Sequence, residues 1–185
     1  MPLPPIPPIV ARRVPAKNKF FTLVEEDLGT EAGAYTYSFI DTTWDAVLVV
    51  PVLADGRLVI ERIYRHPYRA YVYEFPAGGI DHGEDPCAAG ARELEEETGY
   101  QASSVRLLQS FEPVPGLCRM RLHVVLATDL KQTGKRSHEA LELIEVVEAD
   151  LPQALAWTKI QPCSGFLLTG VLLWEQEIRR QLLAD

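Results

Sequence analysis

The chain has few cysteines and no excess of basic residues. Its three cysteines, Cys87, Cys118 and Cys163, form no CxxC pair. This spacing predicts neither a disulfide framework nor a zinc site, and it is typical of a reducing compartment. Lysine and arginine number 18 against 26 aspartate and glutamate, for a formal net charge of −8 at pH 7. Because an acidic protein repels polyanions, we expect no nucleic-acid partner.

Long apolar runs are also missing. No stretch is long enough to cross a membrane. The proline-rich start, residues 1–10, lacks the basic-then-apolar layout of a signal peptide. We therefore expect a cytoplasmic protein with no membrane partner, and we interpret residues 1–10 as an extended arm. At 185 residues, 47% of them hydrophobic, the chain suits one soluble domain with an appendage, or a small domain plus a short second unit.

Strand-like and helix-like patterns alternate in blocks. Two strand-like runs within residues 17–40 predict a small antiparallel β unit. An Asp-Gly hairpin signal separates apolar runs at residues 45–52 and 58–63. Further strand-like segments cover residues 72–75, 105–111, 122–130 and 141–147. Residues 165–183 have the apolar spacing of an amphipathic helix. This order favours an α+β fold with a mixed sheet between helices.

The segment at residues 78–100, GGIDHGEDPCAAGARELEEETGY, carries most of the information. Asp85 and Pro86 predict the start of a helix, since Asp is a favourable N-cap and Pro fits the first turn. Gly99 predicts its end. The apolar-to-neutral stripe expected to pack consists of Cys87, Ala91, Leu94 and Thr98.

Three acids share another face of this helix. At about 100° per residue, Glu93, Glu96 and Glu97 fall within an arc of roughly 100°. No cation on that face is expected to offset their repulsion. A hard cation would do so, because Mg²⁺ binds a few carboxylates, keeps several waters and completes its shell with substrate phosphates. A solvated acidic face is the plainer interpretation of ELEEE alone, but Gly78 and Gly79, which let backbone approach a ligand, favour the metal site.

The spacing of this segment resembles the Nudix box. Nine specified positions match it: Gly78, Glu84, Arg92, Glu93, Leu94, Glu96, Glu97, Gly99 and Tyr100. The resemblance implies the Nudix fold, an α/β/α sandwich, and a pyrophosphohydrolase that depends on Mg²⁺, with Mn²⁺ as a possible substitute. It further implies that Glu93 and Glu97 bind the metal with Glu96 as a helper. Arg92 would pair with a box glutamate, and Glu84 would be a structural or metal-shell partner.

The flanks of the box resemble the ADP-ribose and nucleotide-sugar pyrophosphatase branch of that family. Residues 64–65 and 74–78 are similar to its QYR and ELPAG stretches. The resemblance implies that the Ala77 carbonyl ligates a metal, that Arg65 contacts phosphate or the terminal sugar, and that Glu74 lies near the substrate. An ordinary surface cation is the alternative interpretation of Arg65.

Two more features bear on this branch. Pro115, sixteen residues after Gly99, stands where the branch carries a proline, but the Ser-x-Glu that usually follows is replaced by Leu-Cys-Arg, which leaves the preference for ADP-ribose itself open. Residues 1–43 resemble the β unit that such proteins exchange between protomers, which implies a homodimer, with residues 44–185 as the Nudix hydrolase domain. Five aromatics in or next to this unit offer stacking surfaces for a base, although most aromatics at strand spacing fill cores: Phe20, Phe21, Tyr35, Tyr37 and Trp44.

The catalytic base has two candidates. The branch commonly supplies a glutamate from a late loop, where Glu139 and Glu142 both fit, although lone acids in polar loops are more often solvated. The expected reaction is hydrolysis of the diphosphate of ADP-ribose, or of a related nucleoside diphosphate sugar, to a nucleoside monophosphate and a sugar phosphate. The alternatives are another nucleoside diphosphate derivative, such as GDP-mannose, UDP-glucose or a dinucleoside polyphosphate, and a non-catalytic nucleotide-sensing module. The intact box disfavours the module.

Overall fold

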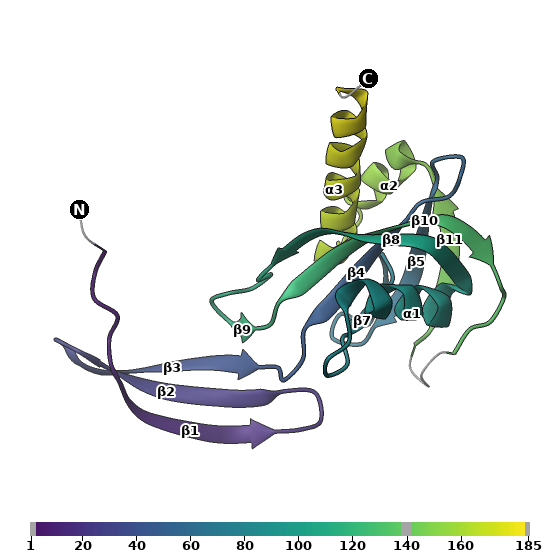
Figure 1. Cartoon of the computed structure of the whole chain (residues 1–185). Helices are drawn as coiled ribbons and strands as arrows, with labels where there is room; N and C mark the ends of the chain where they lie inside the picture. The colour runs from purple at the N-terminus through teal and green to yellow at the C-terminus, as the bar shows by residue number, and fades with distance from the viewer. Residues whose placement is uncertain (1–2, 138–141, 184–185) are drawn as a thin grey trace. The chain divides into compact units, whose positions relative to one another are not determined.

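The computed structural model describes residues 3–137 and 142–183 and divides into two compact units (Figure 1). The first unit comprises Met1–Asp45 and Phe111–Arg121, and the second comprises Ala46–Ser110 and Leu122–Asp185. The boundary thus falls two residues after the predicted one, and the first unit includes a later segment, Phe111–Arg121, that was not predicted to belong to it. Within the ranges described, the two units share no sheet.

The first unit is built on a four-stranded sheet of order β1-β2-β3-β9. Its strands are β1 (Ile9–Lys17), β2 (Thr22–Thr30), β3 (Gly33–Asp41) and β9 (Cys118–Arg119). The first three form an antiparallel meander, and β9 lies parallel to β3. The prediction of an extended arm over residues 1–10 is wrong at its end, because β1 already begins at Ile9.

Charge pairs, rather than apolar alternation, tie β1 to β2. All nine residues of β1 are exposed. Arg13 donates hydrogen bonds to Asp27 at 2.6 Å and to Glu25 at 3.2 Å. Arg12 donates to Glu26 at 3.2 Å. Cross-strand pairs of opposite charge stabilise a sheet, but they leave no hydrophobic period in the sequence, which explains why this strand was not predicted.

The second unit contains two sheets, of order β7-β4-β10-β8 and β11-β5-β6. The strands are β4 (Ala46–Pro51), β5 (Leu58–Arg65), β6 (Ala70–Glu74), β7 (Ala77–Gly79), β8 (Tyr100–Phe111), β10 (Leu122–Gln132) and β11 (Ile144–Ala149). β10 runs parallel to β4, whereas β7 runs antiparallel to it. The predicted mixed sheet is therefore confirmed.

Three helices belong to the second unit: α1 (Pro86–Thr98), α2 (Leu151–Trp157) and α3 (Gly165–Leu182). Both predicted ends of α1 are observed. Asp85 accepts hydrogen bonds from the backbone N–H of Cys87 and Ala88, and Gly99 closes the helix at φ 75°. α2 was not predicted, because seven residues are too few to show a helical period. Within the residues that the structure describes, no helix is long and apolar enough to span a membrane.

Helices cover both faces of β4. Val47 and Val49 pack in one cluster with Ala89 and Leu94 of α1. Alternate residues of a strand point to opposite faces, so the intervening side chains of β4 face the other way, and α3 contacts β4 as well. The approach of α1 depends on Gly90, since a Cβ there would lie 2.6 Å from a Val125 methyl carbon. The result places α1 and its acids directly on the central strands.

Candidate active site

The three acids of α1 lie at different depths. Glu97 is buried, with 6% of its surface exposed, whereas the side chains of Glu93 and Glu96 are 13% and 42% exposed. The buried residues of α1 are Ala89, Gly90, Leu94, Glu97 and Thr98. The predicted packing stripe is confirmed at Leu94 and Thr98, which are buried, and at Cys87, which is half-buried and packs against the core cluster, whereas Ala91 is half-buried and is not part of that cluster. Because Gly90 has no side chain, this side of α1 packs directly on the sheet. Glu97 lies on the same side and is therefore buried.

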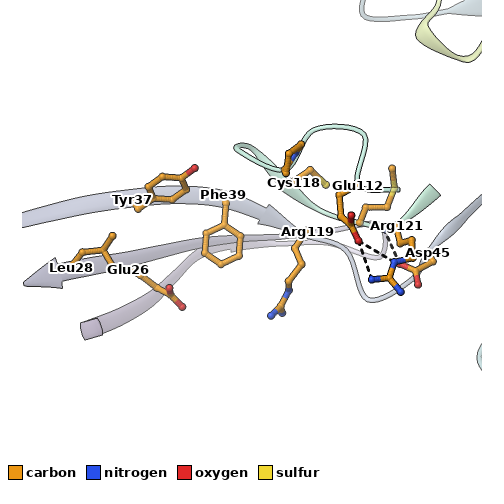
Figure 2. Close-up of a pocket in the computed structure, with 11 residues that line it drawn as sticks. Glu26, Leu28, Tyr37, Phe39, Asp45, Glu112, Cys118, Arg119 and Arg121 are labelled. Carbon is orange, nitrogen blue, oxygen red and sulfur yellow. Dashed lines mark hydrogen bonds and ion pairs between the residues drawn. The ribbon is translucent and has the colours of Figure 1, made fainter. Parts of the chain in front are cut away.

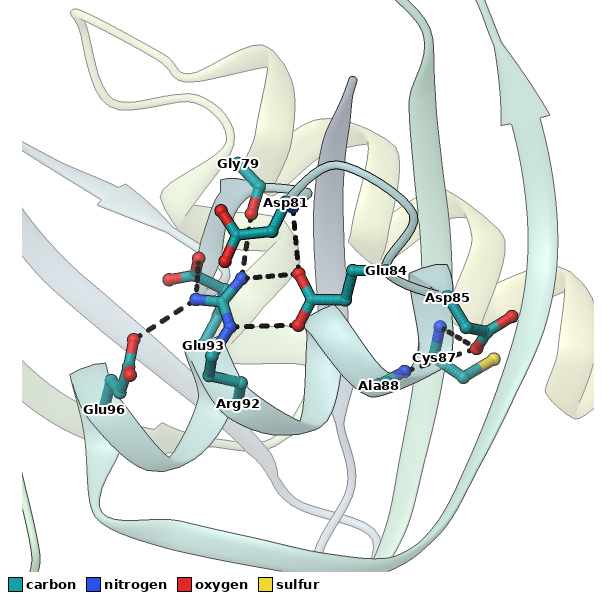
Figure 3. A network of polar contacts seen from close by, with 9 residues as sticks. All are labelled: Gly79, Asp81, Glu84, Asp85, Cys87, Ala88, Arg92, Glu93 and Glu96. Carbon is teal, nitrogen blue, oxygen red and sulfur yellow. Dashed lines mark hydrogen bonds and ion pairs between the residues drawn. The ribbon is translucent and has the colours of Figure 1, made fainter. Parts of the chain in front are cut away.

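Arg92 donates hydrogen bonds to three glutamates of the box, Glu84, Glu93 and Glu96 (Figure 3). Its Nε and Nη2 donate to the two carboxylate oxygens of Glu84 at 3.1 and 3.0 Å. Its Nη1 donates to Glu93 at 2.7 Å and to Glu96 at 3.3 Å. The prediction that no cation offsets the acidic face is therefore wrong. These hydrogen bonds from Arg92 lower the pKa of Glu84, so Arg92 and Glu84 form a charged clamp beside the metal-ligand candidates.

The loop before α1 is fitted to the acids. A Cβ built on Gly78 would stand 2.1 Å from Cδ of Glu93, so a side chain at position 78 would displace the Glu93 carboxylate. The backbone N–H of Ala77 donates to Oε2 of Glu97 at 2.9 Å. Ala77 and Gly78 both belong to β7, which pairs with β4. The structure thus places Glu97 against Ala77 and Glu93 against Gly78, and metal binding by these groups stays a prediction.

A fourth acid, Glu61 of β5, was missed in the sequence. It is 1% exposed, and its Oε1 has no hydrogen-bond partner among the described residues. Burial, and then the charge of Glu74, raise the pKa of Glu61. Burial, and then the charge of Glu61, raise the pKa of Glu97. A single acid within the apolar run LVIERI is the signal that could have revealed it.

Two residues predicted to meet the substrate pair with each other. Nε of Arg65 donates to Oε1 and Oε2 of Glu74 at 3.2 and 3.1 Å. The side chain of Glu74 is 8% exposed and that of Arg65 is 40% exposed. Arg65 is therefore an anchored cation of the site's own unit, and the interpretation as an ordinary surface cation is disfavoured.

The segment before the late loop is attached to the end of α1. The backbone N–H of Ser137 donates to the carbonyl of Glu96 at 2.9 Å, and Nε of Arg136 donates to the carbonyl of Thr98 at 3.2 Å. Beyond the loop, Glu142 is half-buried. Burial is the main cause that raises the pKa of Glu93 and Glu97, and the charge of Glu142 raises it further. Glu142 therefore lies near the acids of α1. Glu139, the other predicted base, lies outside the described residues.

The chemistry of this cluster suits a hard divalent cation. In the described part of the chain, no three His, Cys, Asp or Glu side chains form a group that could hold a metal ion. Glu93 accepts a hydrogen bond from Arg92, and Glu97 accepts one from Ala77. The donors are nevertheless all oxygens, which Mg²⁺ and Mn²⁺ prefer. The unpartnered oxygen of Glu61 is one further acceptor available to an ion. The residues therefore fit such an ion in type.

Trp44 and Pro115 belong to the first unit. Nε1 of Trp44 donates to the carbonyl of Phe20 at 2.9 Å. Pro115 lines a cavity of about 740 Å³ within this unit, which Tyr37, Phe39 and Arg119 also line (Figure 2). The described lining of this cavity does not include Trp44. Of the two aromatic side chains that line the cavity, Tyr37 is one of the predicted stacking surfaces for a base, whereas Phe39 was not predicted.

Comparison with known proteins decides the family. Residues 42–162 match the model of the NUDIX domain. The chain belongs to the Nudix family. It is 33% identical over 147 residues to the ADP-ribose pyrophosphatase of Bacillus subtilis (strain 168), covering 79% of this chain and 80% of that protein. It is 30% identical over 156 residues to the ADP-ribose pyrophosphatase of Mycobacterium tuberculosis, covering 83% and 70%.

A solved structure shares the fold. The crystal structure of an ADP compounds hydrolase matches with a TM-score of 0.87 at 24% identity, covering 98% of both chains. The predicted Nudix fold, the predicted branch and the predicted hydrolase class are confirmed. Nudix hydrolases generally use a divalent metal ion, which agrees with the oxygen donors of α1.

Proposed function

We propose that the protein hydrolyses the diphosphate bridge of ADP-ribose, or of a closely related nucleoside diphosphate sugar, to a nucleoside monophosphate and a sugar phosphate. The observation that carries this proposal is the complete box folded into one cluster, with Gly78 beneath the Glu93 carboxylate and Ala77 bonded to Glu97. The similarity to two proteins named ADP-ribose pyrophosphatase supports the choice of substrate.

Mg²⁺ is the ion that we propose for this site, with Mn²⁺ as a substitute. Glu93, Glu97 and the Ala77 carbonyl would hold it, and Glu96 would assist. When bound, such an ion neutralises charge on the diphosphate and lowers the pKa of a coordinated water. It also removes the repulsion that a protein of net charge −8 exerts on an anionic substrate.

The chain's own side chains would position the reactants and move the proton. We propose that Glu142 takes a proton from the attacking water, since it lies near Glu93 and Glu97. Glu139 is the rival base. Arg65 donates to Glu74 through Nε and Nη2, which leaves Nη1 for a phosphate oxygen. Arg92 would hold Glu93 in position.

A substrate panel tests the proposal. Purified protein is offered ADP-ribose, GDP-mannose, UDP-glucose, NADH, diadenosine polyphosphates and dNTPs, first with Mg²⁺ and then with EDTA, and products are separated by chromatography. We expect AMP and ribose 5-phosphate from ADP-ribose, and no turnover in EDTA. Faster turnover of GDP-mannose or UDP-glucose would move the assignment to that substrate. Absence of any metal-dependent turnover by folded protein would refute it.

We also propose a homodimer formed through the first unit. Ile9, Val10 and Val14 of β1 are 58%, 62% and 52% exposed, and β1 is an edge strand of its sheet. Exposed apolar side chains on an edge strand are suited to pairing with another copy. Light scattering coupled to size-exclusion chromatography should give twice the 20.7 kDa chain mass, whereas a monomer at micromolar concentration would contradict this.

A cytoplasmic location is proposed from the three free cysteines.

A further inference from the structure

Glu61 is a buried acid without an evident structural purpose. Carboxylates are almost never fully buried unless they are paired, yet Glu61 is 1% exposed and lies in β5 among Val59, Ile60 and Ile63, which are also buried. Its Oε1 is enclosed and accepts no hydrogen bond from any described residue. A buried acceptor without a partner is rare in native proteins and requires an explanation.

The side chain of Glu61 lies on the α1 side of β5. Val59, two residues earlier on the same face of the strand, packs in one cluster with Ala89 and Leu94 of α1. The pKa of Glu97 agrees with this placement of Glu61. Burial raises that pKa most, and the charge of Glu61 is the next largest cause. The unpartnered oxygen therefore belongs to the cluster around Glu97.

The cations near Glu61 have other hydrogen-bond acceptors. Nε of Arg65 donates to Glu74, which lies opposite Glu61 in the register of β5 and β6. Nε of Arg136 donates to the carbonyl of Thr98. A valine at position 61 would continue the apolar pattern of the strand without any desolvated charge. The acid at position 61 is explained if its carboxylate binds an ion when the metal site is occupied.

We propose that Glu61 is an additional carboxylate of the metal site, contributing Oε1 to a divalent cation that it shares with Glu97. This inference rests on the proposed function only in taking the acids of α1 as metal-binding residues. It extends the ligand set beyond the box to a second element of the fold, β5, which a scan of the box motif does not include.

Metal binding without substrate tests this directly. Mn²⁺ is titrated into metal-free protein, and free ion is measured by electron paramagnetic resonance. We expect Glu61→Gln to weaken binding of one ion about 10- to 100-fold, the range seen when groups that support metal ligands are removed, or to lose that ion. Glu145→Gln is the matched control, because Glu145 lies on the neighbouring strand β11 and pairs with Arg62 at the surface. Equal affinity and equal ion number in Glu61→Gln, the wild type and the control would overturn the proposal.

Thermal stability gives a second readout and a check on folding. In EDTA, Glu61→Gln should melt no lower than the wild type, since an amide does not carry the cost of burying an ionisable acid. Mn²⁺ should then raise the melting temperature of the wild type by more than that of the variant. Glu61→Asp, which keeps the charge on a shorter side chain, should bind Mn²⁺ with intermediate affinity. If Mn²⁺ stabilises all three proteins equally, the inference is wrong. Wild-type protein that binds Mn²⁺ as expected but does not hydrolyse ADP-ribose would instead count against the proposed function alone.

Discussion

The carboxylate of Glu93 rests on the backbone of Gly78, so closely that a Cβ at position 78 would stand 2.1 to 2.4 Å from Cδ, Oε1 and Oε2 of Glu93. Gly78 and Glu93 belong to separate elements, the edge strand β7 and helix α1. The first glycine of the box and the first glutamate of its helix are therefore one unit in the fold, and the contact fixes where the carboxylate can reach.

Gly78→Ala should displace Glu93 and reduce metal-dependent turnover at least about 100-fold, because a misplaced catalytic group costs that much. The fold should survive, since the clash falls on a side chain rather than on the core. Circular dichroism and Mn²⁺ titration check both points. Gly165→Ala is the control, because nothing lies within 4 Å of a Cβ built there. Normal turnover in Gly78→Ala would show that this contact does not matter.

Arg92→Lys should lose activity despite keeping the charge. Arg92 bonds both oxygens of Glu84 and also Glu93 through a planar fork, which an ammonium group cannot reproduce. We expect turnover to fall about 10- to 100-fold and Mn²⁺ to bind more weakly. Arg106→Lys, at a surface pair with Glu177, should behave as the wild type. Wild-type kinetics in Arg92→Lys would mean that charge alone is sufficient.

The choice between the two candidate bases can be made by kinetics. Glu142→Gln should lower kcat about 100- to 10,000-fold, the usual worth of a general base, with KM little changed because substrate binding does not depend on the proton acceptor. Glu139→Gln should retain the wild-type kcat. The reverse pattern would assign the base to Glu139.

The metal-free protein should lose stability as pH rises. Burial raises the pKa of Glu61 and Glu97 above the ordinary value of 4.5, so the folded state holds protons that the unfolded chain releases. Stability is then greatest below about 4.5 as far as these two groups are concerned, and it falls as pH rises from there through neutrality towards their folded values. Urea unfolding in EDTA between pH 6 and pH 9 measures this. Glu61→Gln should flatten the slope, and an unchanged slope would contradict the assignment of the effect to Glu61.

The site could be predicted where its signal is local in the sequence. The ends of α1 at Asp85 and Gly99 are confirmed, since capping depends on adjacent residues. Glu61 was missed because its meaning comes from burial beside Glu97, thirty-six positions away. The predicted packing face of α1 omitted Gly90, because only the folded structure shows that Val125 lies against it. Such contacts arise from tertiary structure, which the pattern of a single segment does not contain.

The most direct measurement is the rate at which Glu97→Gln hydrolyses ADP-ribose in saturating Mg²⁺, beside the wild type and Glu95→Gln. Glu95 is on the same helix but bonds Gln101 instead of the cluster. If buried acids of α1 hold the cation that engages the diphosphate, Glu97→Gln is folded and at least about 1,000-fold slower, while Glu95→Gln keeps the wild-type rate. A folded Glu97→Gln that turns over at the wild-type rate contradicts the account.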